Sequence, residues 1–453
     1  MIDLRNYQRS AVDAIPGYFM SGKTGNPLIV APTGSGKSVI IAKFMEESCQ
    51  MYPQLRILML SHRKELLQQN FTKLIQLWPD APAGVYSAGL NSRQVGRNIT
   101  VAGIASIYKK AHLLGWIDLI LIDECHLVPG GDRTEGEGMY LKLIADLKKI
   151  NRRLKVIGFT ATPFRMASGM LTEGGGIFTD IAYEIEIAPL VREGHLMPLI
   201  SKVPLTQADL SNVHVRGGEF VAAEAEKALD DERLTQAAID EMEKYLSDRK
   251  SWIVFTQGVA HAHHVCAALN ARGHQAEVVT GDTPDMFRAQ SLNRFKSGAL
   301  KVLVNCDVLT TGFDAPRTDA IILLRATQST GLYIQICGRG MRPSPETGKM
   351  NCIVLDFAGN IGRHGPIDAI KIQRRAGSMD DEDAKEVSKA PTKVCPQCRA
   401  ATPISVARCP ECGYEYPAAP KHDTVASTKE IMTTFKPPKR YVVTSTSFLK
   451  QPQ

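Results

Sequence analysis

Short apolar runs alternate with longer segments of helical periodicity through the first third of the chain. Each run holds three or four residues, and the runs are Leu28–Val30, Ile57–Leu60, Leu119–Ile122 and Val156–Phe159. Such runs between helices are typical of strands in a parallel sheet that helices cover on both faces. The pattern therefore predicts a doubly wound α/β domain.

The same alternation returns after residue 250. Its apolar runs are Trp252–Phe255, Val302–Val304, Ala320–Leu324 and Ile353–Leu355. Two such blocks predict an α/β fold of two doubly wound parallel-sheet lobes in tandem. We place the lobes at residues 1–195 and 196–375.

The sequence between the two blocks changes character twice. Ala188–Val215 holds three prolines, so we expect an irregular connection between the lobes. Glu219–Asp248 is rich in Ala, Glu, Leu and Lys, which predicts helix with a solvated charged face.

Beyond Arg375 the chain becomes poor in apolar residues. Residues 376–393 contain the acidic run Asp380–Asp383, which indicates a flexible linker. A cysteine-bearing module follows at 394–417, and we expect residues 418–453 to be a flexible tail.

Composition and charge exclude several classes of protein. With 44% hydrophobic residues among 453, the chain can build at least two cores, which rules out wholesale disorder. Neither a membrane-length apolar run nor a secretory signal in Met1–Ser10 is present. The net charge of +7 permits a nucleic-acid partner without requiring one.

A glycine-rich loop follows the first apolar run. The segment Ala31–Ser38 reads APTGSGKS and leads into the helical stretch Val39–Glu47. Strand, loop and helix in this order form the cradle in which backbone N–H groups face a phosphate. The residues expected to hold the nucleotide are Thr33, Gly34, Ser35, Gly36, Lys37 and Ser38, with the Lys37 ammonium on the β- and γ-phosphates and the Ser38 hydroxyl on Mg²⁺.

Two carboxylates follow the apolar run Leu119–Ile122. Asp123 and Glu124 would lie at the carboxyl edge of the sheet, beside the phosphate loop. Asp123 is then a candidate for holding Mg²⁺, and Glu124 for orienting and deprotonating an attacking water. A pair of strand-capping acids is the alternative, and the spacing from the phosphate loop disfavours it.

Together the two motifs resemble those of superfamily 2 helicases and translocases, in which an alanine such as Ala31 commonly opens the phosphate loop. Further matches occur in family order at Leu4–Gln8, Ser61–Arg63, Thr160–Pro163, Thr310–Asp314 and Gln335–Arg342. Several segments are similar to those of RadD-like bacterial repair helicases and related phage proteins, namely DECH, TATPFR, VLTTGFDAP, QICGRGMRP and DFAGN. The resemblance covers about residues 1–360 and implies two RecA-like lobes.

For the first lobe, the resemblance implies an adenine-recognition element and a coupling element. Gln8 has the donor and acceptor needed to read an adenine edge, and Arg5 would support it. His126, Thr160 and Thr162 would link hydrolysis to movement of the lobes.

For the second lobe, the resemblance implies groups that complete the ATPase site. Arg339 and Arg342, three residues apart on an expected helix, would place two guanidinium groups on the developing γ-phosphate charge. Gln335 would touch the nucleotide or the attacking water, and Asp314 would contact the ribose or these arginines.

The resemblance also implies contacts with nucleic acid. Hydroxyl and N–H groups at strand ends suit phosphates and carry no base information, so binding should be non-sequence-specific and weaken as salt rises. The loop Gly103–Ser106 belongs to this set, and the candidate residues are Ser61, Arg63, Thr256, Thr310 and Thr311. The resemblance favours DNA over RNA.

Four of the ten cysteines form two C-P-x-C pairs. Cys395, Cys398, Cys409 and Cys412 present four thiolates, which is the ligand set of tetrahedral structural Zn²⁺. Iron in a rubredoxin-like site is the alternative. The other six cysteines are scattered through apolar stretches and should be buried thiols.

A histidine cluster lies within the second lobe. His261 and His264 would share one face of a helix, but the sequence shows no carboxylate or cysteine partner for them. We expect surface or packing roles.

The sequence thus favours an ATP- and Mg²⁺-dependent DNA helicase or translocase with a zinc ribbon, acting in repair or replication. The expected location is the cytoplasm of a bacterial or phage-infected cell. A fork remodeller that does not separate strands, an RNA helicase and an ATP-gated nucleic-acid clamp stay open as alternatives. Repair or replication proteins are possible partners.

Overall fold

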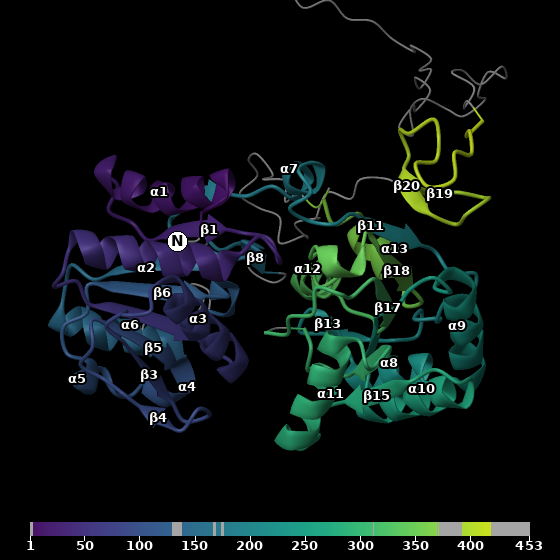
Figure 1. The fold of residues 1–453 in the computed structure, drawn as a ribbon, viewed down its shortest axis with the longest axis horizontal. Helices are drawn as coiled ribbons and strands as arrows, with labels where there is room; N and C mark the ends of the chain where they lie inside the picture. The colour runs from purple at the N-terminus through teal and green to yellow at the C-terminus, as the bar shows by residue number, and fades with distance from the viewer. Residues whose placement is uncertain are drawn as a thin grey trace, which may run out of the picture.

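Two α/β lobes lie side by side in a computed structural model (Figure 1). The structure describes residues 3–128, 138–165, 169–173, 176–310, 312–368, 370 and 392–417. The predicted linker and the tail 418–453 lie outside these residues, apart from the last two linker positions. Two parallel-sheet lobes confirm the predicted fold class.

The first lobe is built on an eight-stranded sheet. In spatial order its strands are β10 (Asp180–Glu184), β1 (Pro27–Val30), β7 (Lys155–Thr160), β6 (Leu119–Asp123), β2 (Ile57–Ser61), β5 (Ile99–Gly103), β3 (Ala83–Ser87) and β4 (Ser92–Arg93). All neighbours run parallel except the edge pair β3–β4. The four predicted strands occupy its centre.

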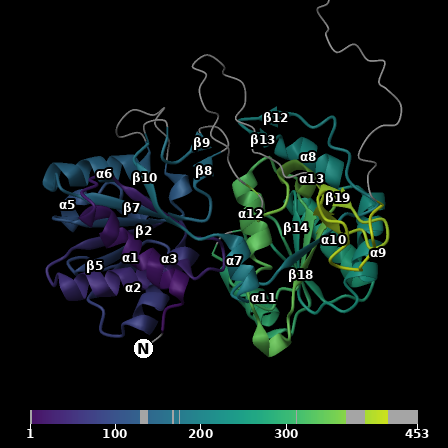
Figure 2. The same cartoon turned by 90° about the horizontal axis from the view of Figure 1, so that it is seen from above.

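Helices cover both faces of the first sheet, as Figure 2 shows from above. One face packs on α1 (Asn6–Met20), α2 (Lys37–Met51) and α3 (Lys64–Leu77). The other packs on α4 (Ile104–Ile107), α5 (Ala111–Leu114) and α6 (Met139–Ile150). Each face therefore has its own apolar core, which explains why the central strands are apolar throughout.

The second lobe has a six-stranded sheet that is parallel throughout. In spatial order its strands are β11 (Leu199–Lys202), β18 (Cys352–Asp356), β17 (Ala320–Leu324), β14 (Trp252–Thr256), β16 (Val302–Asn305) and β15 (Ala276–Val279). The helices α9 (Glu232–Tyr245) and α10 (Val259–Ala271) cover one face. The other face carries α11 (Asp285–Ser297), α12 (Thr330–Gly338) and α13 (Asn360–His364).

The connection between the lobes is more ordered than predicted. The stretch expected to be irregular contains α7 (Ile187–Arg192) and β11, and β11 forms one edge of the second sheet. Four half-buried residues paired through their backbone leave little apolar pattern, which is why the strand could not be read from the sequence.

The segment predicted as helix is interrupted. It begins with β13 (Glu219–Phe220), which pairs with β12 (Val215–Arg216), and continues as α8 (Ala222–Leu229) and then α9. The side chain of Asp231 accepts a hydrogen bond from the Leu234 amide and so starts α9 anew.

The remaining elements are short. They are the pair β8 (Phe164–Arg165) and β9 (Gly169–Met170), the 3-10 turns η1 (Cys125–Leu127) and η2 (Pro345–Thr347), and β19 (Thr392–Val394) with β20 (Ala401–Pro403). Within the described part of the chain, no helix combines the length and the apolarity needed to cross a bilayer.

Candidate functional site

A cleft of about 1240 Å³ separates the two lobes. The carboxyl ends of β1, β2 and β6 face it from the first lobe, because parallel strands end at one edge of a sheet. The predicted residues that line it are Arg5, Thr33, Gly34, Gly36, Lys37, Ser38, Arg63, Asp123, Glu124, Asp314, Gln335, Arg339 and Arg342. The fold thus gathers most of the predicted site in one place.

The phosphate loop joins β1 to α2 in the predicted order. Gly34 has a φ of 92° and Gly36 a φ of 84°, which is the left-handed region that favours glycine. The lack of a Cβ also allows close approach, since a Cβ at Gly36 would lie 2.4 Å from the Gln8 side-chain amide nitrogen. Ser35 is buried, and its hydroxyl donates to the Pro32 carbonyl at 2.7 Å.

The N-terminal element lies against this loop. The Gln8 side chain accepts from the Arg5 amide at 3.1 Å and donates to the Ser35 carbonyl at 3.0 Å. Tyr7 donates to the same carbonyl at 3.0 Å, and its ring centroid lies 5.5 Å from that of His195. Tyr7 and His195 were missed from the sequence, although Tyr7 lies inside the recognised motif.

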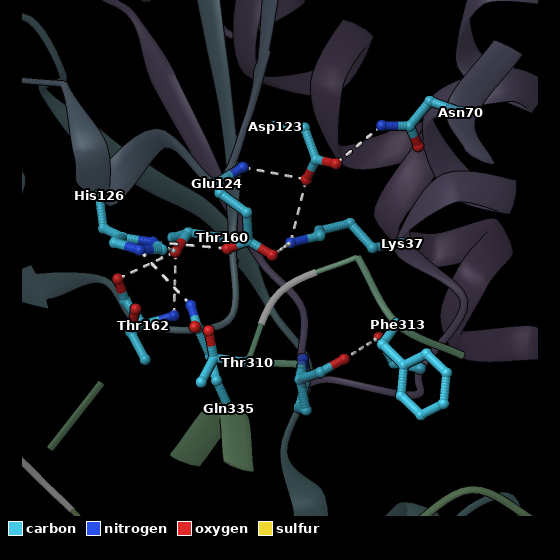
Figure 3. Close-up of polar contacts among 12 residues, drawn as sticks. Lys37, Asn70, Asp123, Glu124, His126, Thr160, Thr162, Thr310, Phe313 and Gln335 are labelled. Atoms are coloured by element: carbon cyan, nitrogen blue, oxygen red, sulfur yellow. Dashed lines mark hydrogen bonds and ion pairs between the residues drawn. The ribbon is translucent and has the colours of Figure 1, made fainter. Parts of the chain in front are cut away.

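Lys37 forms ion pairs with both acids that follow β6. Its Nζ lies 3.0 Å from Asp123 Oδ1 and 2.6 Å from Glu124 Oε1 (Figure 3). Burial alone would lower the pKa of Lys37, but the charges of Asp123 and Glu124 outweigh it and raise that pKa. Burial would likewise raise the pKa of Glu124, whereas Lys37 and His126 hold it below its ordinary value. Glu124 is therefore an ionised carboxylate at neutral pH, as a general base must be.

Asn70 of α3 supports the first acid. Its Nδ2 donates to Asp123 Oδ2 at 2.8 Å, and the Glu124 amide donates to the other Asp123 oxygen at 3.0 Å. A buried carboxylate oxygen and the Ser38 hydroxyl are donors that Mg²⁺ accepts, so these residues fit the predicted metal. The sequence contained no signal for Asn70, because it lies in the middle of a helix.

The backbone at Glu124 is unusual. Its φ is 53° in the left-handed region, which costs a non-glycine residue about 1–2 kcal/mol. The turn aims the side chain at Lys37 instead of continuing the strand alternation, and such outliers concentrate at functional sites.

A chain of polar contacts leads from this acid to the second lobe (Figure 3). His126 Nδ1 lies 3.4 Å from Glu124 Oε2 and 3.1 Å from Thr160 Oγ1, while its Nε2 lies 3.5 Å from Gln335 Nε2. Thr160 Oγ1 also donates to the Thr162 carbonyl and accepts from the Thr162 amide, each at 3.0 Å. The three residues expected to couple the lobes thus lie together at the junction.

The two arginines do not lie on a helix, contrary to the sequence expectation. Helix α12 ends at Gly338, so Arg339 caps it and Arg342 lies in the following turn, where two glycines weaken helix formation. Arg339 donates to the carbonyls of Thr310 (at 2.6 Å) and Phe313, and Arg342 pairs with Asp314. Burial, followed by the nearby Arg342 charge, lowers the pKa of Arg339 to about 10, so Arg339 stays cationic at neutral pH.

The residues predicted to contact nucleic acid differ in how accessible their side chains are. Ser61 and Thr256 are buried, and Thr256 Oγ1 donates to the carbonyls of Gly258 and Asn305, so in this conformation neither hydroxyl faces a ligand. Arg63 lines the cleft, whereas Thr310 is largely buried against Arg339. Thr311 lies outside the described residues.

The lobes touch each other at the cleft. A Cβ at Gly338 would lie 2.6 Å from Thr33 Cβ of the phosphate loop. Lys64 Nζ lies 3.0 Å from Asp285 of α11, and Gln69 donates to the Gly312 carbonyl. The site is therefore assembled from two bodies that already meet at several points.

The four predicted metal ligands lie together. Their sulfur atoms all lie within 4.8 Å of one another, with Cys395 and Cys412 at 3.6 Å and Cys398 and Cys409 at 3.7 Å. Zn–S bonds of 2.3 Å in a tetrahedron would separate sulfurs by about 3.8 Å, so the cluster fits zinc. The six other cysteines are buried, as predicted.

The metal module extends the second sheet. Lys202 of β11 bridges to Ala400 and donates through Nζ to the Cys398 carbonyl at 3.0 Å. The Val203 amide donates to the Arg399 carbonyl at 3.0 Å, and the Arg399 side chain donates to Val203 and Pro204. The module therefore covers the exposed edge of β11 rather than standing apart.

The histidine cluster is divided. His261 is fully buried, which is consistent with a packing role, whereas His264 Nδ1 lies 2.9 Å from Asp230. The carboxylate partner was not evident in the sequence because Asp230 lies more than thirty residues earlier.

Two protein-family models match the chain. The model described as "Type III restriction enzyme, res subunit" matches residues 1–165, and "Helicase conserved C-terminal domain" matches residues 236–344. The two matches coincide with the phosphate-loop lobe and most of the second lobe.

Similar proteins occur in yeast and phage. IRC3 of Saccharomyces cerevisiae, named as an ATP-dependent helicase, is 27% identical over 79% of this chain and 51% of its own length. The 51.5 kDa protein of a Lactococcus phage is 26% identical over 89% of this chain and 81% of its own. The chain thus spans about half the length of the yeast relative.

Solved structures share the fold. A fragment of an HsdR subunit of a type I restriction enzyme from Vibrio vulnificus has a TM-score of 0.60 at 23% identity, over 78% of this chain and 64% of its own. The restriction-modification enzyme LlaBIII bound to DNA has a TM-score of 0.55 at 15% identity, and the match covers 78% of this chain and 27% of that enzyme. Saccharomyces cerevisiae Dbp5 bound to RNA and ADP BeF3 has a TM-score of 0.52 at 15% identity, and the match covers 78% of this chain and 82% of Dbp5.

Proposed function

The chain belongs to the superfamily 2 helicases, and from that premise we propose that it is a DNA-stimulated ATPase that moves along or unwinds DNA. The observation that carries the proposal is the polar chain from Lys37 through Glu124 and His126 to Gln335, which links the ATPase residues of one lobe to the other. A motor needs such a link because hydrolysis must alter the fit between its lobes.

The residues of the first lobe supply the chemistry. Lys37 would leave its two acids for the β- and γ-phosphates when ATP enters, which frees Asp123 to hold Mg²⁺ together with the Ser38 hydroxyl. Bound Mg²⁺ would neutralise phosphate charge. Glu124 would orient the attacking water and accept its proton, since its carboxylate is ionised and lines the cleft.

The residues of the second lobe respond to the nucleotide. Arg342 would exchange Asp314 for the γ-phosphate, whereas Arg339 is held by two carbonyls and would act on the cleft from that fixed position. Gln335 would report the change to His126. Repeated closing and opening of two lobes that grip the same strand would then produce movement along it.

DNA is the preferred track in this proposal. The restriction-enzyme neighbours support it, since one is named as bound to DNA, and the net charge of +7 suits a polyanion. A neighbour named as bound to RNA shares the fold, so RNA is an outcome of the test.

The test is steady-state ATPase activity with no polymer, single-stranded DNA, duplex DNA, forked DNA and RNA. Stimulation by one DNA form, abolished by Lys37→Ala and by Glu124→Gln, would support a DNA motor. Glu124→Gln should retain ATP binding because it keeps the shape of the loop. Stimulation by RNA alone would show that the protein acts on RNA instead of DNA. Tight ATP binding without turnover on any polymer would contradict the motor function and favour an ATP-gated clamp.

A further inference from the structure

One stretch of the first lobe carries cations and no acids. From Ala81 to Ile117 the sequence contains no Asp or Glu, although acids make up 47 of the 453 residues. The same stretch holds four basic residues, Arg93, Arg97, Lys109 and Lys110. About four acids would be expected at the average density, so the stretch is depleted in negative charge.

The fold concentrates these cations around two tyrosines. The Lys110 ammonium and the Arg93 guanidinium each lie 5.2 Å from the centre of the Tyr86 ring, and Lys110 Nζ also lies 3.0 Å from the Tyr86 hydroxyl. Lys109 lies 5.3 Å from the centre of the Tyr108 ring. We call Arg93, Lys109 and Lys110, with the two tyrosines beneath them, the basic hairpin patch.

Within the part of the chain that the structure describes, no carboxylate forms an ion pair with the patch. Among the described residues, the ion pairs of the first lobe involve other cations and reach none of Arg93, Arg97, Lys109 and Lys110. Arg93 and Lys109 are exposed, and Lys110 is half-buried. The side chains therefore present unpaired positive charge to solvent, which attracts polyanions.

The patch continues the edge on which nucleic-acid contacts were predicted. Ser61 lies beside Gly103 in the β2–β5 register, and Tyr86 lies beside Ala102 in the β5–β3 register. The Ser106 hydroxyl then accepts from the Ala88 amide at 2.9 Å, which ties the predicted loop to the hairpin. In Figure 1, β4 and α4 lie at the lower end of the first lobe, away from α1 and the phosphate loop.

We propose that the basic hairpin patch binds the phosphate backbone of the nucleic acid outside the ATPase cleft, and that it supplies about three of the phosphate contacts. The inference rests on the proposed function and extends the nucleic-acid-binding surface beyond the edge between the lobes. Nucleic acid is favoured over an acidic protein because the hairpin is hydrogen-bonded to the loop Gly103–Ser106, for which the sequence predicts contact with the nucleic-acid backbone.

The salt dependence of binding tests the patch directly. Each lost phosphate contact lowers the slope of log K against log salt by about 0.9 for duplex DNA and about 0.7 for a single strand. The triple variant Arg93→Gln, Lys109→Gln, Lys110→Gln should therefore reduce the slope by nearly 3 on duplex or about 2 on a single strand. Fluorescence anisotropy of labelled DNA across a salt series measures it.

The matched control removes three cations from the opposite edge of the same sheet. Lys148, Arg152 and Arg153 are exposed and precede β7, whose amino end lies away from the cleft. Changing all three to Gln alters the net charge as much as the patch variant does. It should change the slope of log K against log salt by no more than the equivalent of about one phosphate contact. A charge-retaining variant, Arg93→Lys with Lys109→Arg and Lys110→Arg, should restore the wild-type slope and shows that the patch folds.

The ATPase separates failure of this inference from failure of the proposed function. The patch variant should need more DNA for half-maximal stimulation, while its maximal rate at saturating DNA stays near wild type. Equal slopes for the patch and control variants, with a DNA-stimulated wild type, would overturn the patch alone. A wild type that neither binds DNA nor responds to it would overturn both.

Discussion

At the residue scale, the supports around Asp123 decide how the cleft would hold a metal. One carboxylate oxygen accepts from Asn70 and the other faces Lys37, so the carboxylate has a single orientation. Groups that orient a metal ligand commonly contribute a factor of 10–100 to affinity. We therefore expect Asn70 to position the Asp123 carboxylate.

Asn70→Ala should raise the Mg²⁺ concentration for half-maximal ATPase by about 10- to 100-fold. The reason is that Asp123 loses the donor that fixes one oxygen. A Mg²⁺ titration at fixed ATP measures the change, and Gln76→Ala, exposed at the end of the same helix, is the control. Equal Mg²⁺ dependence in the two variants would refute the positioning role.

His261 should make the second lobe sensitive to acid. Burial lowers its pKa to about 4, so between pH 6.5 and pH 4 the unfolded chain takes up a proton that the folded chain refuses. Stability is therefore unaffected above pH 6.5 and falls as pH drops, by about 3 kcal/mol at pH 4. His261→Leu should remove this loss.

Denaturant unfolding of wild type and His261→Leu at pH 7.5, 5.5 and 4.5 measures the difference. The variant should gain relative to wild type as pH falls. His264→Leu is the control, since that residue is exposed and paired with Asp230. A difference between wild type and His261→Leu that does not vary with pH would contradict the prediction.

At the element scale, the metal module pairs with the edge strand β11 of the second sheet. The two cysteine pairs share one backbone feature, because Arg399 and Gly413, which each follow the second cysteine of a pair, both lie in the left-handed region. Arginine in that conformation is strained, yet its side chain binds the Val203 and Pro204 carbonyls. The strained residue is thus the one that docks the module.

Metal removal should loosen β11 and leave the first sheet intact. Hydrogen exchange at the Val203 amide should rise by about tenfold or more with a strong chelator, because its acceptor is the Arg399 carbonyl. Amides of β1 should be unchanged. Metal analysis should find one zinc in the wild type and none in Cys409→Ser.

Arg399→Gly separates docking from metal binding. Glycine suits the left-handed backbone, as Gly413 does after the other cysteine pair, so zinc content should be retained. Loss of the side-chain bonds should still increase exchange at the Val203 amide. Exchange equal to that of the wild type would show that the backbone pairing alone holds the module.

At the scale of the whole molecule, the ATPase site exists only where two bodies meet. Gly338 allows α12 to contact the phosphate loop, since a Cβ there would lie 2.6 Å from Thr33 Cβ. Van der Waals contact between carbons requires about 3.5 Å or more. Any side chain at this position therefore forces the lobes apart.

Gly338→Ala should lower kcat by about 10- to 100-fold, because a displacement near 1 Å is enough to misplace groups across a catalytic cleft. ATP binding should persist, since the phosphate loop lies in the first lobe. Gly362→Ala is the matched control, because that glycine is also helical and a Cβ there meets nothing within 4 Å. If both variants keep wild-type kcat, the contact at Gly338 does not limit closure.

Local patterns were sufficient to predict the sheet centres and the ATPase motifs. Strands such as Leu119–Asp123 are apolar throughout because helices cover both faces, and the loop at Gly34 and Gly36 needs glycine for its backbone. Edge strands such as β11 and β4 were not predicted, since they are short and only partly buried. Asn70 was missed for a similar reason, because a polar residue inside a helix carries no local sign of its partner.

The sequence by itself determined the family, the phosphate loop, the acid pair and the metal-ligand set, because each depends on residue types at short spacing. Tertiary structure decided which distant groups meet. It joined Asn70 to Asp123, His126 to Gln335, and the cysteine module to β11. It also gathered the cations of an acid-free stretch into one patch. These pairings depend on sheet order and lobe contact, which involve residues tens to hundreds of positions apart and leave no periodic signal in the chain.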